Sequence, residues 1–213
     1  SIDELEQLNI IALEMGKIAP VSLRINPDID PKTHPYISTG LKANKFGIPH
    51  TEALEIYHRT AELKGIKPIG IDCHIGSQIV NLDPLLQALD KLLELIDKLA
   101  SRDIILDHID LGGGLGVTYD SEEPPHPTMY MEAIRNRLGN RALTLILEPG
   151  RSITADAGIF VSEIILTKTN QGQNFAIADG AMNDFIRPSL YDAWQKIIPI
   201  STVAHSGQIE ASF

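Results

Sequence analysis

The sequence contains a single cysteine, Cys73, so no disulfide bond can form within the chain. A protein without disulfides fits a reducing compartment, and we expect a cytoplasmic location. No apolar run reaches the length of about 18 residues that a membrane-spanning helix needs. The first residues also lack the basic and apolar regions of a signal peptide. The sequence therefore predicts no membrane association.

Basic residues are also in the minority, because 18 Lys and Arg stand against 28 Asp and Glu and give a net charge of −10. A surface this acidic argues against nucleic acid or an anionic membrane as the main partner. The 213 residues are 43% hydrophobic, which is enough for one good core and part of a second.

Helical and strand patterns alternate along the first part of the chain, at intervals of roughly 35 residues. Ser1 and Glu4 form the pattern of a capping box before the first helix, and Thr51 is the expected N-cap of the second. Apolar strands alternating with helices are typical of a parallel sheet, and four such units make half of a (β/α)₈ TIM-like barrel. The pattern predicts helices at 2–16, 51–63, 82–100 and 127–138, and strands at 20–26, 69–75, 104–111 and 143–147.

The pattern changes after Arg151. Two strand-like segments, 159–166 and 175–178, are joined by the polar turn 170–173, which is typical of a β-hairpin. The predicted fold is therefore α/β: the C-terminal half of a (β/α)₈ barrel over 1–155, followed by the start of an antiparallel β domain over 156–213. The absence of an initial Met and a strand-like end at 209–213 suggest a piece of a longer protein.

Three of the predicted strands end in polar or glycine-rich motifs, at the edge where such barrels carry their chemistry. The glycine run could let backbone N–H groups approach a phosphate, with Ser77 adding a hydroxyl, or it could be an ordinary turn. The motifs are His74-Ile75-Gly76-Ser77-Gln78, Gly112-Gly113-Gly114-Leu115-Gly116 and Glu148-Pro149-Gly150-Arg151.

Glu148 and His74 each allow two interpretations. Glu148 follows the apolar strand 143–147, so we expect a partly buried carboxylate that needs a partner. That partner is either Arg151 or a protonated ring nitrogen, such as the pyridinium of pyridoxal 5′-phosphate (PLP). His74 is either a histidine satisfied within the core or a ring that stacks on a planar cofactor.

Taken together, the three motifs resemble those of the fold-type III (alanine-racemase-like) PLP-dependent decarboxylases. Within that group, two further stretches resemble the diaminopimelate decarboxylases, and the resemblance covers about residues 1–200. These stretches are 24–27 with 34–40 and 45–48, and 179–184 running into 187–191.

The resemblance implies a role for each motif. His74 would stack on the PLP ring, and Glu148 would pair with its pyridine nitrogen. Arg151 would lie near both the phosphate and a distal carboxylate of the substrate, which Arg187 and Tyr191 would also bind. The implied cofactor-binding residues are His74, Ser77, Gly112, Gly113, Gly114, Glu148, Pro149, Gly150 and Arg151.

The spacing of Arg187 and Tyr191 supports a carboxylate site independently of the resemblance. Pro188 suits the first residue of a helical turn, and residues four apart then point the same way. A guanidinium beside a phenol suits a carboxylate. The alternative is an Arg on a surface turn with a Tyr packed beneath it.

The implied reaction is decarboxylation of meso-2,6-diaminopimelate to L-lysine and CO₂ by a homodimer. The Schiff-base lysine of the family would precede Ser1, because Lys42-Ala43-Asn44 copies only the end of its motif and follows no apolar strand. The family's active-site cysteine, contributed across the dimer, would follow Phe213, and Cys73 is expected in the core. The chain alone should then be inactive.

Three alternatives remain open. One is an ornithine, arginine or carboxynorspermidine decarboxylase, although a distal amine or guanidine requires acids where Arg187 and Tyr191 offer a cation and a phenol. Another is a non-catalytic PLP-binding homologue, and the third is an unrelated barrel with a phosphate site.

Overall fold

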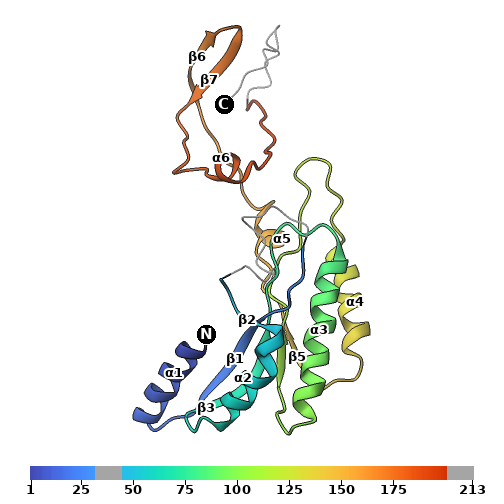
Figure 1. The fold of residues 1–213 in the computed structure, drawn as a ribbon. Coiled ribbons are helices and arrows are strands. Elements are labelled where there is room, and N and C mark those ends of the chain that lie inside the picture. Colours follow the sequence, from blue (N-terminus) through green and yellow to red (C-terminus); the bar gives the residue numbers. More distant parts are fainter. Residues whose placement is uncertain (32–44, 201–213) are drawn as a thin grey trace. The chain divides into compact units, whose positions relative to one another are not determined.

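A computed structural model of the chain describes residues 1–31 and 45–200 (Figure 1). It contains two compact units, one formed by residues 1–117 with 123–155, and one formed by 118–122 with the chain from Asp156 onward. The motif at 34–40, the rejected lysine motif Lys42-Ala43-Asn44 and the strand-like end at 209–213 lie outside the described residues.

The first unit is built on a parallel sheet, as the alternating pattern predicted. Its strands lie in the order β2-β1-β3-β4-β5, and every neighbouring pair runs parallel. Their carboxyl ends therefore share one edge, and the motifs that follow β3, β4 and β5 start from neighbouring positions. The strands are β1 (Ala19–Asn26), β2 (Ile48–Pro49), β3 (Ile66–Asp72), β4 (His108–Asp110) and β5 (Thr144–Ile146).

Helices α1 to α4 accompany this sheet. The sequence predicted an N-terminal cap for α1 and for α2, and only the first prediction is confirmed. The Ser1–Glu4 capping box of α1 is present as predicted. The predicted Thr51 cap is wrong, because α2 begins at His50 and Pro49 occupies the N-cap position without a side-chain cap bond. The fixed φ of proline sets the chain direction there instead. The helices are α1 (Ile2–Glu14), α2 (His50–Glu62), α3 (Leu82–Ala100) and α4 (Pro127–Leu138).

The predicted strand 20–26 is confirmed as β1, whereas the other three predicted strands are displaced or shorter, and the short strand β2 was missed. The predicted strand 69–75 is β3 at 66–72, and 104–111 reduces to β4 at 108–110. Leu106, Leu111 and Ile75 are buried but lie outside the strands. Apolar side chains thus continue into buried loops, so hydrophobicity overestimates the length of the hydrogen-bonded strand.

The core forms between α3 and the sheet. Leu89, Leu92 and Leu99 of α3 are fully buried, as are Ile71 of β3 and Ile109 of β4. The predicted core position of Cys73 is confirmed, since the residue is 3% exposed. Burial raises the pKa of its thiol to about 12, so the thiol stays protonated and unreactive at neutral pH.

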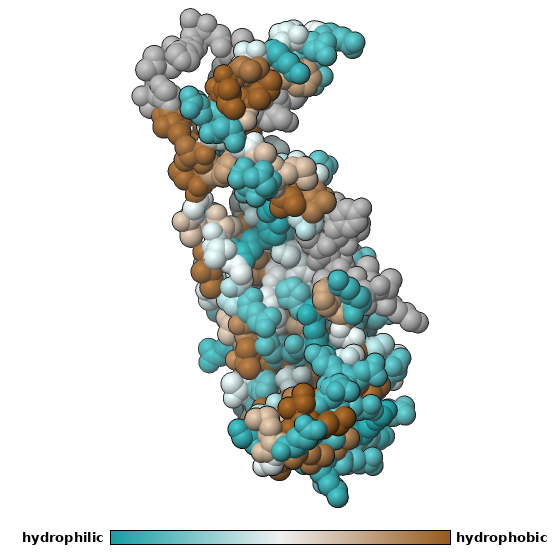
Figure 2. Space-filling view, turned by 90° about the vertical axis from the view of Figure 1, so that its left-hand side faces the viewer, coloured by the Kyte–Doolittle hydropathy of each residue, from teal (hydrophilic) through white to brown (hydrophobic). Residues whose placement is uncertain are grey.

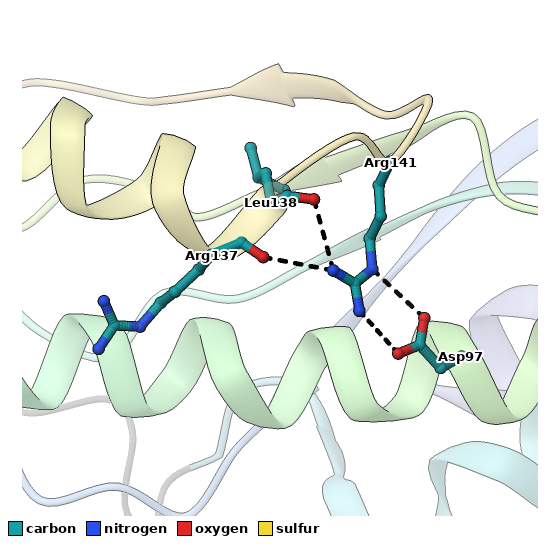
Figure 3. Close-up of polar contacts among 4 residues, drawn as sticks. All are labelled: Asp97, Arg137, Leu138 and Arg141. Carbon is teal, nitrogen blue, oxygen red and sulfur yellow. Dashed lines mark hydrogen bonds and ion pairs between the residues drawn. The ribbon is translucent and has the colours of Figure 1, made fainter.

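Arg141 ties α4 to α3 (Figure 3). Its guanidinium donates two hydrogen bonds to the Asp97 carboxylate of α3, at 3.3 and 2.8 Å. It also donates to the carbonyls of Arg137 and Leu138, at 3.3 and 3.4 Å, and so satisfies acceptors at the end of α4. A bidentate pair of this kind sets the direction as well as the strength of the contact.

Apolar side chains reach the surface along α1, and Figure 2 shows apolar surface at the end of the first unit where α1 lies. Ile10, Ile11, Leu13 and Met15 are each about half exposed. Among the helices within residues 1–31 and 45–200, none combines the length and the apolar character that crossing a bilayer requires.

The second unit contains the predicted hairpin, formed by β6 (Ile164–Asn170) and β7 (Gln173–Ala178). Gln171 and Gly172 have φ values of 52° and 84°, the two positive values of a type I′ turn. The first strand was predicted to begin at Ile159, which is wrong. The Glu163 N–H donates to the Asp179 carboxylate at 2.8 Å, so a side chain takes the place of a strand partner before β6 begins.

Replacing Ile109 by Ala should destabilise the full-length protein by about 3 kcal/mol, because the substitution leaves a cavity at a position with 0% exposure. The matched control is Ile105→Ala, at a residue that is 66% exposed, and we expect a loss below about 1 kcal/mol. Urea unfolding measures both. Equal losses in the two variants would contradict the assignment of the core.

Candidate active site

The loops that follow β3, β4 and β5 are joined by backbone hydrogen bonds. The Cys73 N–H donates to the Asp110 carbonyl at 3.0 Å, and the Glu148 N–H donates to the Gly112 carbonyl at 2.8 Å. The parallel alignment thus continues beyond the strands. The structure thereby brings the first residues of the three predicted motifs into adjoining positions.

Glycine is required where these loops approach one another. A Cβ on Gly113 would lie 2.2 Å from the Glu148 carbonyl oxygen, a distance that no side chain tolerates. Gly112 has a φ of +63°, and a Cβ there would lie 2.7 Å from the Cys73 carbonyl oxygen. The glycine run is therefore a packing requirement of the strand ends, whatever else it binds.

Two of the glycine N–H groups bind protein acceptors. The Gly112 N–H donates to Oδ1 of Asp110 at 2.8 Å, and the Gly113 N–H donates to Nδ1 of His74 at 3.2 Å. The hydrogen bond from Gly113 orients the His74 ring and requires a lone pair on Nδ1. In the neutral ring the proton then resides on Nε2.

His74 is held as a neutral imidazole. Burial lowers the pKa of His74, and the nearby positive charge of Arg24 lowers it further, while Glu148 and Asp110 oppose the shift. Arg24 also donates from Nη2 to the His74 carbonyl at 3.4 Å. A neutral, flat ring fixed at one nitrogen is suited to stacking against another planar group.

Arg151 contacts the β3 motif through Ser77. Its Nε and Nη2 donate to the Ser77 hydroxyl oxygen at 3.3 and 3.1 Å. Arg151 ends the motif that follows β5 and begins the short helix α5 (Arg151–Thr154), so the contact links residues 74 positions apart in the sequence. A guanidinium and a hydroxyl at one place form a donor set that suits an anion.

Glu148 is exposed, and the expectation of a partly buried carboxylate is wrong for the described residues. Pro149 and Gly150 are exposed as well, and nothing lies within 4 Å of where a Cβ on Gly150 would be. The physical reason is the position of β5 at the edge of the described sheet, where it pairs with β4 alone.

A row of charged side chains across the sheet was missed from the sequence. Arg24 of β1, Asp72 of β3 and Asp110 of β4 are aligned in register on neighbouring strands. Burial raises the pKa of Asp72 to about 6, with the negative charges of Asp110 and Glu148 adding to the shift and Arg24 opposing it. The available signal was that Asp72 and Asp110 interrupt apolar strands two residues before His74 and Gly112.

Arg187 and Tyr191 lie together in the second unit, as their spacing predicted. They form the short helix α6 (Arg187–Tyr191), and the guanidinium carbon lies 5.4 Å from the centre of the tyrosine ring. Nε of Arg187 is buried and has no hydrogen-bond partner among residues 1–31 and 45–200. The pair thus keeps a donor available for an acceptor that the described residues do not supply.

The raised pKa of Asp72 makes a prediction for stability against pH. The folded chain holds the Asp72 proton more strongly than the unfolded chain does. Protonation of Asp72 therefore stabilises the fold fully below pH 3.8, and this stabilisation is lost as the pH rises to about 6. Asp72→Asn removes that loss. Between pH 4 and 7, we expect the free energy of unfolding of Asp72→Asn to rise by about 1–2 kcal/mol relative to wild type, a figure reduced for partial exposure.

Denaturant unfolding across this pH range measures the effect. Asp107→Asn, at an exposed aspartate one residue before β4, is the control and should change by much less. Stability curves for Asp72→Asn and wild type that run parallel from pH 4 to 7 would contradict the assignment.

The chain resembles known decarboxylases along most of its length. It is 55% identical over 201 residues to diaminopimelate decarboxylase of Haemophilus influenzae, which covers 94% of this chain and 48% of that protein. It is also 55% identical over 195 residues to the Pseudomonas aeruginosa diaminopimelate decarboxylase, covering 92% of this chain and 47% of that one. The chain therefore spans about half the length of the curated relatives it matches.

A solved structure supports the fold. The crystal structure of Helicobacter pylori diaminopimelate decarboxylase complexed with L-lysine superposes with a TM-score of 0.91 at 42% identity, over 95% of this chain and 51% of that chain. Residues 1–155 match the family described as "Pyridoxal-dependent decarboxylase, pyridoxal binding domain". Pyridoxal phosphate is thus the cofactor of this protein, and the chain belongs to the pyridoxal-dependent decarboxylase family.

Proposed function

We propose that the full-length protein decarboxylates meso-2,6-diaminopimelate to L-lysine and CO₂ with PLP as cofactor. The observation that carries the proposal is the meeting of three consecutive strand ends, which gathers His74, Ser77, Glu148 and Arg151 in one region. The relatives at 55% identity bear the name of this activity, and the Helicobacter pylori enzyme was solved with L-lysine, the expected product.

The residues of the site fit the charges of PLP. Its phosphate is an anion, and Arg151 and Ser77 offer a cation and a hydroxyl at hydrogen-bond distance from each other. Its ring nitrogen carries a proton, and the exposed Glu148 carboxylate can accept from it. The N–H groups of Gly112 and Gly113 already donate to protein atoms. We therefore assign these two glycines to shaping the phosphate side of the site, together with Gly114.

Each residue then has one task. Ser77 and Arg151 hold the phosphate, with Pro149 and Gly150 preceding Arg151 in the motif after β5. His74 stacks as a neutral ring, and Glu148 keeps the proton on the ring nitrogen. When bound, PLP supplies an electron sink that accepts the pair left by the departing CO₂. A carboxylate at Glu148 favours the cationic ring that this chemistry needs.

The choice of substrate rests on Arg187 and Tyr191. Diaminopimelate carries a second carboxylate beside the amine at its distal end, whereas ornithine carries the amine alone. The buried Nε of Arg187 is a donor that suits the carboxylate, and a lone distal amine would leave it unpaired.

Three broader assignments accompany this function. We propose residues 1–155 as part of a PLP-binding barrel and 156–213 as the start of a β domain, supported by the division of contacts after Ala155. We propose a homodimer of the full-length protein, by family resemblance. We also propose the cytoplasm as its location, in keeping with a single, buried cysteine.

The function is tested by assaying the full-length protein with PLP against meso-diaminopimelate and ornithine. We expect kcat/KM for diaminopimelate to exceed that for ornithine by at least about 100-fold, because a site built for a charged group leaves its cation unpaired with the wrong substrate. Arg187→Gln should reduce that ratio, and Arg135→Gln on the exposed face of α4 should not. Preference for ornithine would refute the proposed substrate.

Arg151→Gln should raise the dissociation constant for PLP by about 10- to 100-fold, because one charge-assisted hydrogen bond to the phosphate is lost. Titration of the apo-protein, followed by the visible absorbance of bound PLP, measures it. Arg135→Gln again serves as the matched control, since it removes the same charge from a surface helix. Unchanged PLP affinity in Arg151→Gln would remove Arg151 from the phosphate site.

A further inference from the structure

Gln78 makes an unusual contact with the loop that leaves the glycine run. Its Nε2 donates to the Val117 carbonyl at 2.6 Å, and its Oε1 accepts from the Val117 N–H at 3.1 Å. The side-chain amide thus binds both backbone groups of one residue, as a neighbouring strand would. Both donor and acceptor of the amide are used, so its orientation is defined.

The same two loops are joined by a short stretch of parallel pairing beside this contact. The Ile79 N–H donates to the Gly114 carbonyl and the Gly116 N–H donates to the Ile79 carbonyl, both at 2.9 Å. Ile79 and Leu115 form an isolated parallel bridge, and both side chains are buried. The Gln78 amide extends this pairing to Val117.

The backbone at Gln78 is strained. Its φ is +57°, in the left-handed region that residues with a side chain adopt at a cost of about 1 kcal/mol. Such a conformation persists only where the surroundings over-determine it, and the two bonds to Val117 do so. Ser77 precedes this residue, so the direction of its hydroxyl toward Arg151 depends on the same backbone.

We propose that Gln78 is a positioning residue that fixes the loop after β3 to the loop containing the glycine run. It thereby keeps the Ser77 hydroxyl within hydrogen-bond distance of Arg151. The inference rests on the proposed function, because Ser77 and Arg151 are assigned there to the PLP phosphate. Gln78 acts through these residues and through the backbone of 114–117. Its removal should therefore weaken cofactor binding more than it slows the reaction of the loaded enzyme.

The test uses two variants of the full-length protein. Gln78→Gly removes the clamp at a position whose φ suits glycine, and Gln78→Glu keeps the shape but loses the donor to the Val117 carbonyl. Gln87→Glu, at an exposed position of α3, is the matched control. The first readout is hydrogen–deuterium exchange of the Val117 amide in the apo-protein, which we expect to accelerate by at least about 10-fold in Gln78→Gly. The acceleration should be smaller in Gln78→Glu, because its carboxylate can still accept from the Val117 N–H.

The second readout is the PLP dissociation constant beside kcat at saturating PLP. We expect the constant to rise about 10-fold in Gln78→Gly, with a smaller fractional fall in kcat, and Gln87→Glu to match the wild type. Unchanged Val117 exchange, or faster exchange with unchanged PLP affinity, would overturn the proposal. Loss of folding in both variants would do so too, since Gln78 would then serve stability alone.

The proposed function and the positioning role of Gln78 can be tested separately. If wild-type protein bound no PLP, the proposed function would fall, while Val117 exchange in the apo-protein would still report on the clamp. If wild type bound PLP and decarboxylated diaminopimelate while the Gln78 variants matched it, only the positioning role would fall.

Discussion

The close approach of the loops after β3, β4 and β5 depends on backbone contacts that pass through Gly112 and Gly113. The Glu148 carbonyl oxygen lies 2.2 Å from where a Cβ of Gly113 would be, and the Cys73 carbonyl oxygen lies 2.7 Å from where a Cβ of Gly112 would be. Any side chain here would push the strand ends apart. His74 would then lose the Gly113 N–H, and the distance from the β5 motif to Ser77 would change.

The alignment of the strands also determines which charged side chains lie near one another and how their pKa values shift. Charged residues on neighbouring strands come into register, so Arg24, Asp72 and Asp110 form a row next to the strand ends. Burial favours the neutral forms of Asp72 and His74, which shifts the pKa of the acid upward and that of the base downward. The proposed cofactor site thus combines an imidazole whose neutral form is favoured with the cation of Arg151 and the exposed carboxylate of Glu148. A cofactor with an anionic phosphate and a protonated ring requires such a mixture of charges.

The positions around this centre are held by a second set of contacts, from groups that the proposed chemistry does not use. Gln78 and Ile79 join the β3 loop to the glycine loop, and Asp110 orients Gly112. Precision in a binding site comes from such supporting groups, because a side chain that faces a ligand can move unless its own backbone is fixed. Strain at Gln78 fits this pattern, since strained conformations concentrate where the surrounding structure over-determines them.

The amino-acid sequence by itself determined the helices α1, α3 and α4, the parallel sheet, the hairpin and the three strand-end motifs, because hydrophobic periodicity and turn residues act locally. Only the tertiary structure decided which side chains face each other. The exposure of Glu148 at a sheet edge depends on which strands flank β5, and the row from Arg24 to Asp110 depends on strand register. The clamp from Gln78 to Val117 joins residues 39 positions apart. Such contacts arise from packing between distant segments, and no local pattern in the sequence encodes them.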